Sequence, residues 1–143
     1  MVKNILLGVV AAAVLTACAA PAQKGVQPED IRDSAHFVTE SIISNLDFPS
    51  LQSRLFQHRS ACGSAPRFIM DKGETGYAML VETAEVPESY ENVIIADLVQ
   101  YPESFRAPMR VAFRVYSYYY NDDVQQRLDR MMAAVRTPGV CTP

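Results

Sequence analysis

The sequence predicts an α+β fold, in which an antiparallel sheet of about four strands is covered on one face by an N-terminal helical pair and a C-terminal helix. Apolar residues recur at three- and four-residue steps over 28–46 and again over 124–135, which is typical of amphipathic helices. Over 109–116, large apolar residues alternate with other residues, as in a half-buried strand. The links between the predicted strands are too short for crossover helices, which favours antiparallel pairing.

The first 17 residues have the composition of an export signal. Lys3 supplies a positive charge, and an uncharged apolar run follows over 5–15. A run of this length is too short for the ~20 residues that span a bilayer core, but it suits the hydrophobic region of a signal peptide. Thr16 and Ala17 then lead directly into Cys18.

Leu15-Thr16-Ala17-Cys18 resembles the lipobox of bacterial lipoproteins. The resemblance implies that 1–17 is removed as a signal peptide, that the Cys18 thiol is diacylated with palmitate-like chains, and that the new amino group is acylated as well. Two or more acyl chains hold a protein stably on a membrane, so we expect a lipid anchor without a membrane span. The alternative is a plain secreted protein with a chance cysteine near its cleavage site.

The residue after the lipobox cysteine bears on the membrane that receives the protein. Residue 19 is Ala, whereas an Asp there marks retention in the inner membrane of enteric bacteria. The resemblance therefore favours the outer membrane, facing the periplasm. The inner membrane and the cell surface are the alternatives.

The chain after the signal peptide is long enough for one domain of ordinary size. We expect 18–27, which is rich in small residues, to be a lipidated tether, and 28–143 to be a single globular domain. Without Lys3 the chain has 12 basic and 16 acidic residues, a net charge near −4. A mildly acidic domain lacks the basic surface that phosphate backbones require, so no nucleic-acid partner is expected.

Two helices are predicted at the start of the domain. Pro28 suits the first position of a helix, and we expect that helix to continue to Leu46. After the break at 47–49, a second short helix is expected. The predicted inward residues are Ile31, Ala35, Val38, Ile42 and Leu46 in the first helix and Leu51, Leu55 and Phe56 in the second, whereas Arg54, His58 and Arg59 are predicted to face outward.

The remaining elements follow in order along the chain. Asn121 and the two aspartates after it are expected to cap a closing helix, which ends before Pro138 and Gly139. Its predicted inward residues are Val124, Leu128, Met131, Met132 and Val135. The four strands are predicted at 67–71, 77–84, 93–101 and 109–120.

The cysteines allow one disulfide once Cys18 is set aside. Cys62 and Cys141 remain, and an exported protein meets a compartment that permits disulfides. A bond between them would close a loop of about 80 residues, for which the chain-entropy model gives roughly 4.5 kcal/mol. The alternatives are two free thiols or a bond to another protein.

The sequence contains no convincing catalytic or metal site. His36 and His58 are the only histidines, and each is expected at the surface or at a boundary. The one pair with zinc-ligand spacing, His58 and Cys62, conflicts with the expected disulfide. No Gly-x-Ser-x-Gly or Ser-x-x-Lys motif is present. We therefore expect no catalytic residues, no metal and no cofactor.

The most unusual segment is 110–120, which is rich in arginine and tyrosine. Both residue types are enriched at binding hot spots. One interpretation is that the closing helix covers this face; the other is that the face contacts a protein partner or peptidoglycan. Tyr116 is expected to behave as core, with Arg110 and Arg114 nearer the rim. The residues predicted to share the face are Arg110, Arg114, Tyr116, Tyr118 and Tyr120.

These observations predict a non-catalytic, lipid-anchored lipoprotein of the cell envelope. We expect it to bind an envelope protein as an accessory or assembly factor, and to contact the membrane through its lipid. The alternative is a small periplasmic hydrolase or ligand-binding lipoprotein that acts on cell-wall material or a small molecule.

The anchor can be tested with Cys18→Ser. The substitution removes the thiol that the acyl chains require, so the full-length chain should remain in the precursor or soluble fraction. Membrane fractionation and mass spectrometry measure this. Membrane partitioning equal to that of the wild type would contradict the lipoprotein interpretation.

Overall fold

The computed structural model describes residues 25–141, so the predicted signal peptide, Cys18 and the tether up to residue 24 lie outside the described residues. The described chain has an α+β fold with a five-stranded sheet, one strand more than predicted. The elements are α1 (Pro28–Ser34), β1 (Phe37–Ser44), α2 (Phe48–Cys62), β2 (Arg67–Met70), β3 (Tyr77–Val81), β4 (Ile95–Tyr101), β5 (Arg110–Ser117) and α3 (Asp122–Arg136).

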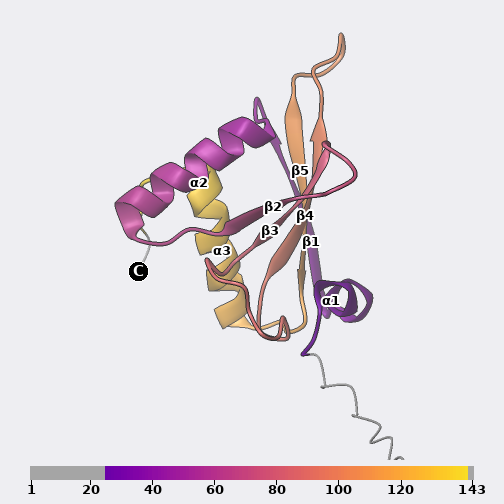
Figure 1. Ribbon diagram of the computed structural model, residues 1–143, viewed down its shortest axis with the longest axis vertical. Helices are drawn as coiled ribbons and strands as arrows, with labels where there is room; N and C mark the ends of the chain where they lie inside the picture. Colours follow the sequence, from indigo (N-terminus) through magenta and orange to yellow (C-terminus); the bar gives the residue numbers. More distant parts are fainter. Residues whose placement is uncertain (1–24, 142–143) are drawn as a thin grey trace, which may run out of the picture.

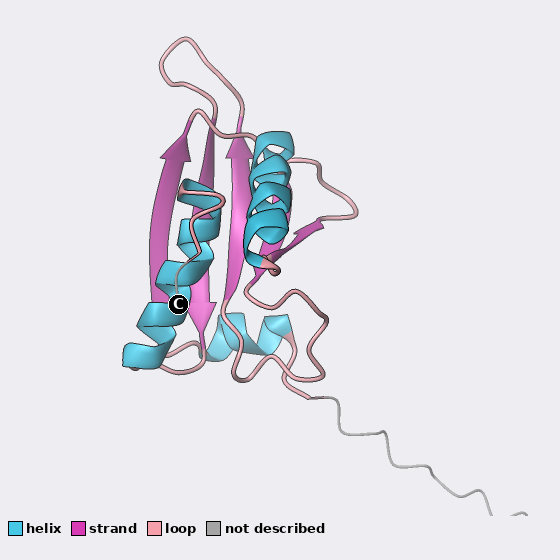
Figure 2. Cartoon of the chain, turned by 90° about the vertical axis from the view of Figure 1, so that its left-hand side faces the viewer, coloured by secondary structure: helices cyan, strands magenta, loops and turns pink. Residues whose placement is uncertain are grey.

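All strands of this sheet are antiparallel, in the order β1-β5-β4-β3-β2. β2 to β5 form a meander, and β1 pairs with β5 along its whole length, from Phe37↔Ser117 to Ser44↔Arg110. The two long helices α2 and α3 cover one face, and the short α1 lies against the other (Figures 1 and 2). The sheet therefore has one fully covered face and one that α1 covers in part.

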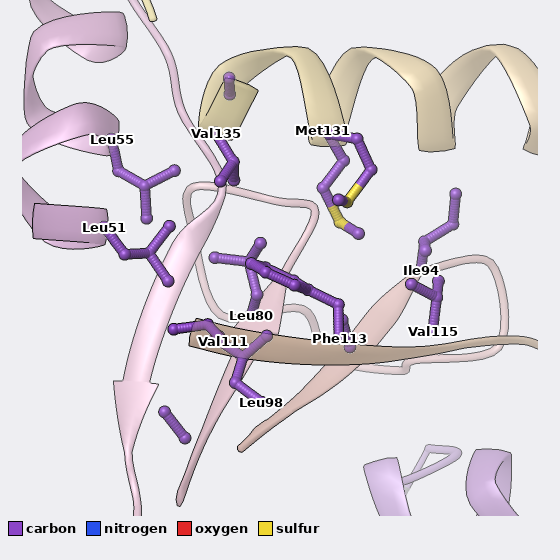
Figure 3. Packing of buried hydrophobic residues seen from close by; sticks show 14 of the residues in the cluster. Leu51, Leu55, Leu80, Ile94, Leu98, Val111, Phe113, Val115, Met131 and Val135 are labelled. Carbon is purple, nitrogen blue, oxygen red and sulfur yellow. The ribbon is translucent and has the colours of Figure 1, made fainter. Parts of the chain in front are cut away.

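The main core lies between the sheet and α2 and α3. β5 contributes alternate residues to it, among them Phe113, which lies on the same side as Met131 and Val135 of α3 (Figure 3). Arg127 Nε of α3 also donates to Glu82 Oε1 at 2.6 Å, next to the end of β3. Packing and this ion pair together orient α3 on the sheet.

Side-chain caps begin both long helices. Asp47 Oδ1 accepts a hydrogen bond from Ser50 N at 2.7 Å, and Asn121 Oδ1 accepts one from Val124 N at 2.9 Å. Hydrogen bonding from Ser50 lowers the pKa of the Asp47 carboxyl. Of the predicted caps, Asn121 is confirmed, and all five residues predicted to face inward on the closing helix are buried.

The predicted helix over 28–46 is wrong beyond Ser34. Residues 37–44 form β1, because Val38, Thr39, Ile42 and Ile43 are β-branched and pack well on a pleated sheet. The four-residue spacing of Val38 and Ile42 fits a helical stripe, but it also places both side chains on one face of a strand. The spacing of apolar residues alone therefore did not distinguish a helix from a strand in this segment.

Three further expectations about the helices are wrong. Phe56, predicted to face inward, is 74% exposed, whereas His58, predicted to face outward, is buried at 9%. The buried positions of α2 step from Leu51 to Leu55 to His58, and Phe56 lies about 100° around the helix from Leu55. The helices also do not share one face of the sheet, because α1 packs opposite α2 and α3.

The predicted bond between Cys62 and Cys141 is present, with 5.5 Å between the two Cα atoms. It joins the last residue of α2 to the segment that follows α3, across a separation of 79 residues. Because the closed loop contains β2 to β5 and α3, the bond restricts the unfolded chain strongly.

The double variant Cys62→Ser, Cys141→Ser tests the contribution of this bond. The free energy of unfolding should fall by about 2–4 kcal/mol, because the unfolded chain regains the conformations that the closed loop excludes. Urea unfolding of the oxidised wild type, the reduced wild type and the variant measures this. Equal midpoints for all three would contradict a stabilising role.

Candidate functional site

The sheet surface opposite α2 and α3 contains a hollow of about 810 Å³. Strand pairing places alternate residues of β1, β5, β4 and β3 on this surface, in rows that run across the sheet. α1 covers the rows at one end of the strands, and the described residues leave the others uncovered. We call the uncovered part the open face, and its principal residues are Glu40, Ile42, Tyr77, Tyr101, Arg110 and Arg114.

A row of charged residues crosses the middle of this surface. Glu40 pairs with Arg114, and Arg114 pairs with Asp97 of β4. Arg32 of α1 forms a bidentate ion pair with Asp97. Its Nε donates to Oδ2 at 2.9 Å, and its Nη2 donates to Oδ1 at 2.7 Å. The hydrogen bonds from Arg32 to Asp97 raise the pKa of Arg32. The Asp97 carboxylate is thus engaged in holding α1 on the sheet.

Arg114 has only a weak partner in comparison. Its Nε lies 3.6 Å from Glu40 Oε1, and the two side chains are 59% and 71% exposed. Exposed pairs of this kind contribute about 0–1 kcal/mol, because water screens them. The guanidinium of Arg114, positioned 5.7 Å from the ring centre of Tyr116, therefore presents its charge to solvent on the open face.

Tyr116 belongs to a second, smaller core beneath α1. Its side chain is 8% exposed and packs with Ile31, Val81 and Ile95. Burial, with a smaller effect of the nearby Asp97 charge, raises the pKa of Tyr116. The interpretation that the closing helix covers this face is wrong, because α3 lies on the other side of the sheet and α1 provides the cover.

The open face combines apolar and aromatic side chains with arginine. Ile42 is 63% exposed, and Tyr77 and Tyr101 are also exposed large side chains. Arg110 Cζ lies 4.7 Å from the ring centre of Tyr101. Stacking of this kind orients a guanidinium while its edges stay free for hydrogen bonding.

The structure divides the predicted arginine and tyrosine set. Arg110, Arg114 and Tyr116 line the hollow together. Tyr118 and Tyr120 do not, because β5 ends at Ser117 and the strand alternation stops there. Tyr118 makes an edge contact with the His36 ring, and Tyr120 stacks on Phe37, which packs against the main core.

Several residues of this surface escaped the sequence-based prediction. Arg32 and Ile42 lie in the segment predicted as one helix, so their place on a sheet surface was not foreseeable. Asp97 gave a usable indication, since it is the only charged residue in the apolar run 93–99. A lone carboxylate in a buried strand requires a partner, which here is Arg32.

Neither His36 nor His58 lines the hollow. His36 contacts Tyr118, and His58 Nδ1 lies 3.9 Å from Cys62 Sγ, which is part of the disulfide. In residues 25–141, no group of three or more His, Cys, Asp or Glu side chains is placed to hold a metal ion. No helix in the same range is both long and apolar enough to cross a membrane.

Comparison of the chain with protein-family models, with curated proteins and with solved structures finds no match.

A pair of alanine substitutions tests the division between packed and open residues. Tyr116→Ala should lower the free energy of unfolding by about 3 kcal/mol, because removing the buried ring leaves a cavity in the second core. Arg114→Ala should change it by less than about 0.5 kcal/mol, because its surroundings are solvated. Chemical denaturation measures both. Similar losses for the two variants would contradict the division.

Proposed function

We propose that the protein is a non-catalytic, lipid-anchored protein of the cell envelope, which binds a protein partner through the open face. The observation that carries this proposal is the composition of that face, where the exposed side chains of Ile42, Tyr77 and Tyr101 line the same hollow as the exposed guanidinium of Arg114. Large aromatic side chains and arginine are the residues that dominate protein interfaces, because they combine contact area with hydrogen-bonding groups.

The place at which the chain enters the domain supports the same arrangement. The described residues begin at Gly25, and α1 follows on the open-face side of the sheet (Figure 1). The tether from Cys18 to this point can extend to about 25 Å at most. An anchor at Cys18 would therefore hold the α1 end of the domain close to the membrane surface, and the whole domain within reach of other envelope proteins.

The electrostatics favour binding over catalysis. In the charged row, Asp97 is bound to Arg32 and Glu40 lies 3.6 Å from Arg114, and no histidine lines the hollow. A general base requires an acceptor that is placed to take a proton from a substrate, whereas both carboxylates of this row face a guanidinium. This supports a surface that recognises acidic and apolar groups without transforming them.

A second candidate function rests on the hollow itself. Its volume of about 810 Å³ falls among the volumes of small-molecule sites, which are roughly 300–1,000 Å³. In this second function, the protein would bind an anionic fragment of cell-wall material or another small molecule in the hollow, in contact with Arg110 and Arg114.

Site-specific photocrosslinking in intact cells tests the proposal with the full-length chain. A photoreactive residue in place of Tyr77, on the open face, should give one discrete protein adduct. The matched control replaces Phe56, which is 74% exposed on the opposite side of the sheet, and should not give that adduct.

The variant Arg114→Ala should reduce the Tyr77 adduct at least tenfold with an unchanged Tm, because it removes a contact and not a packed side chain. An adduct of low mass in place of a protein would favour the second candidate. Equal adducts from the two labelled positions, or no effect of Arg114→Ala, would contradict an interface on the open face.

A further inference from the structure

β1 is an edge strand, and the direction of its unpaired backbone groups can be derived. The N–H of Asn45 donates to the carbonyl of Met109 at 2.8 Å, which makes these two residues a hydrogen-bonded pair. Bonding alternates along an antiparallel ladder, so the odd-numbered residues of β1 bond to β5. The backbone groups of the even-numbered residues Val38, Glu40, Ile42 and Ser44 therefore point away from the sheet.

Apart from one charged residue, Glu40, this edge lacks the features that keep edge strands from pairing. The other edge strand, β2, has four residues and follows Pro66 directly. β1 has eight residues in unbroken register with β5, without a proline, a lysine or a bulge. Two of its outward residues, Val38 and Ile42, carry exposed apolar side chains. A long, regular and partly apolar edge of this kind is a template for another strand.

We propose that a second copy of this chain pairs with β1 through a two-fold axis at Ile42, so that the two β1 strands run antiparallel. Each symmetric register is defined by the residue at the two-fold axis. Only axes at Thr39, Glu40, Ser41 or Ile42 pair at least five residues of each β1 strand. A centre at Glu40 places two carboxylates opposite each other, which is destabilising. Centres at Thr39 and Ser41 place Glu40 opposite an apolar side chain, Val38 or Ile42 respectively.

The register centred on Ile42 is self-complementary. It places the two exposed Ile42 side chains in contact and Glu40 opposite Ser44 of the second copy. Ser44 is paired with Arg110 on β5, so Glu40 lies between its own Arg114 and Arg110 of the second copy. Adjacent strands are about 4.8 Å apart, and long side chains span two of these spacings. Both exposed Glu40 carboxylates then have a cation on each side.

The same symmetry fits a membrane anchor. The axis is perpendicular to the sheet, so both open faces, and both α1 helices on them, lie on one side of the assembly. Two copies could therefore be anchored to one membrane surface while their sheets join. The open faces become one continuous surface. This inference is independent of whether that surface binds a protein or a small molecule.

Cysteine crosslinking of the full-length protein in its native membranes tests the register. Ile42→Cys should give a disulfide-linked dimer on mild oxidation, because the two Cα atoms would be about 5.5 Å apart. Glu40→Cys should not, because the two positions would be about 14 Å apart. Phe56→Cys, on the exposed side of α2, measures random collisions.

A dimer from Glu40→Cys, equal yields from the three positions, or a crosslink from Ile42→Cys to a different protein would each overturn the proposal. A charge exchange then tests the predicted contact between copies. Adding Glu40→Arg to Ile42→Cys should lower the dimer yield at least tenfold, and adding Arg110→Glu as well should restore it. Restoration excludes misfolding as the cause of the loss, and no loss with Glu40→Arg alone would overturn the register.

Discussion

β5 is the strand around which both halves of this protein are built. It is hydrogen-bonded on one side to β1 and on the other to β4, so it joins the N-terminal segment to the meander. Its alternate side chains serve two different cores: Phe113 faces α2 and α3, and Tyr116 faces α1. An error of one residue in its register would exchange these two sets, placing arginine in the main core. The strand therefore determines which face is closed and which is open.

The ion pair between Arg32 and Asp97 explains how α1, with only seven residues, is held on that open side. A helix of this length contributes little stability on its own, because nucleation is costly. Ile31 is completely buried, and Arg32 bonds bidentately to β4, so a hydrophobic contact and a charged contact act at adjacent positions. The two arginines near Asp97 therefore differ in role. Arg32 holds α1 on the sheet, whereas Arg114 is exposed. An interface on the open face would contact its partner through Arg114.

The sequence predicted the elements whose signals are local, and missed those that depend on distant pairing. α3 was predictable because its cap, its apolar stripe and its end all lie within the segment itself. Residues 37–44 were not, because their strand exists through pairing with β5, more than sixty residues later in the chain. The candidate site shows the same limit. Arg110, Arg114 and Tyr116 share one strand and were identified together, whereas Arg32, Ile42 and Asp97 reach the surface from three other elements.

The connectivity also sets an order in which structure can be completed as the chain is synthesised from the N-terminus. The hairpins of β2, β3 and β4 need only neighbouring sequence and can form as they emerge. β1 can pair only after β5 has been synthesised. The disulfide of Cys62 can form only after Cys141, which follows it by 79 residues. The first strand and the first long helix thus stay without their final contacts until almost the whole chain has appeared. A chain interrupted before β5 would lack both closures, and it would expose apolar surface to chaperones and proteases.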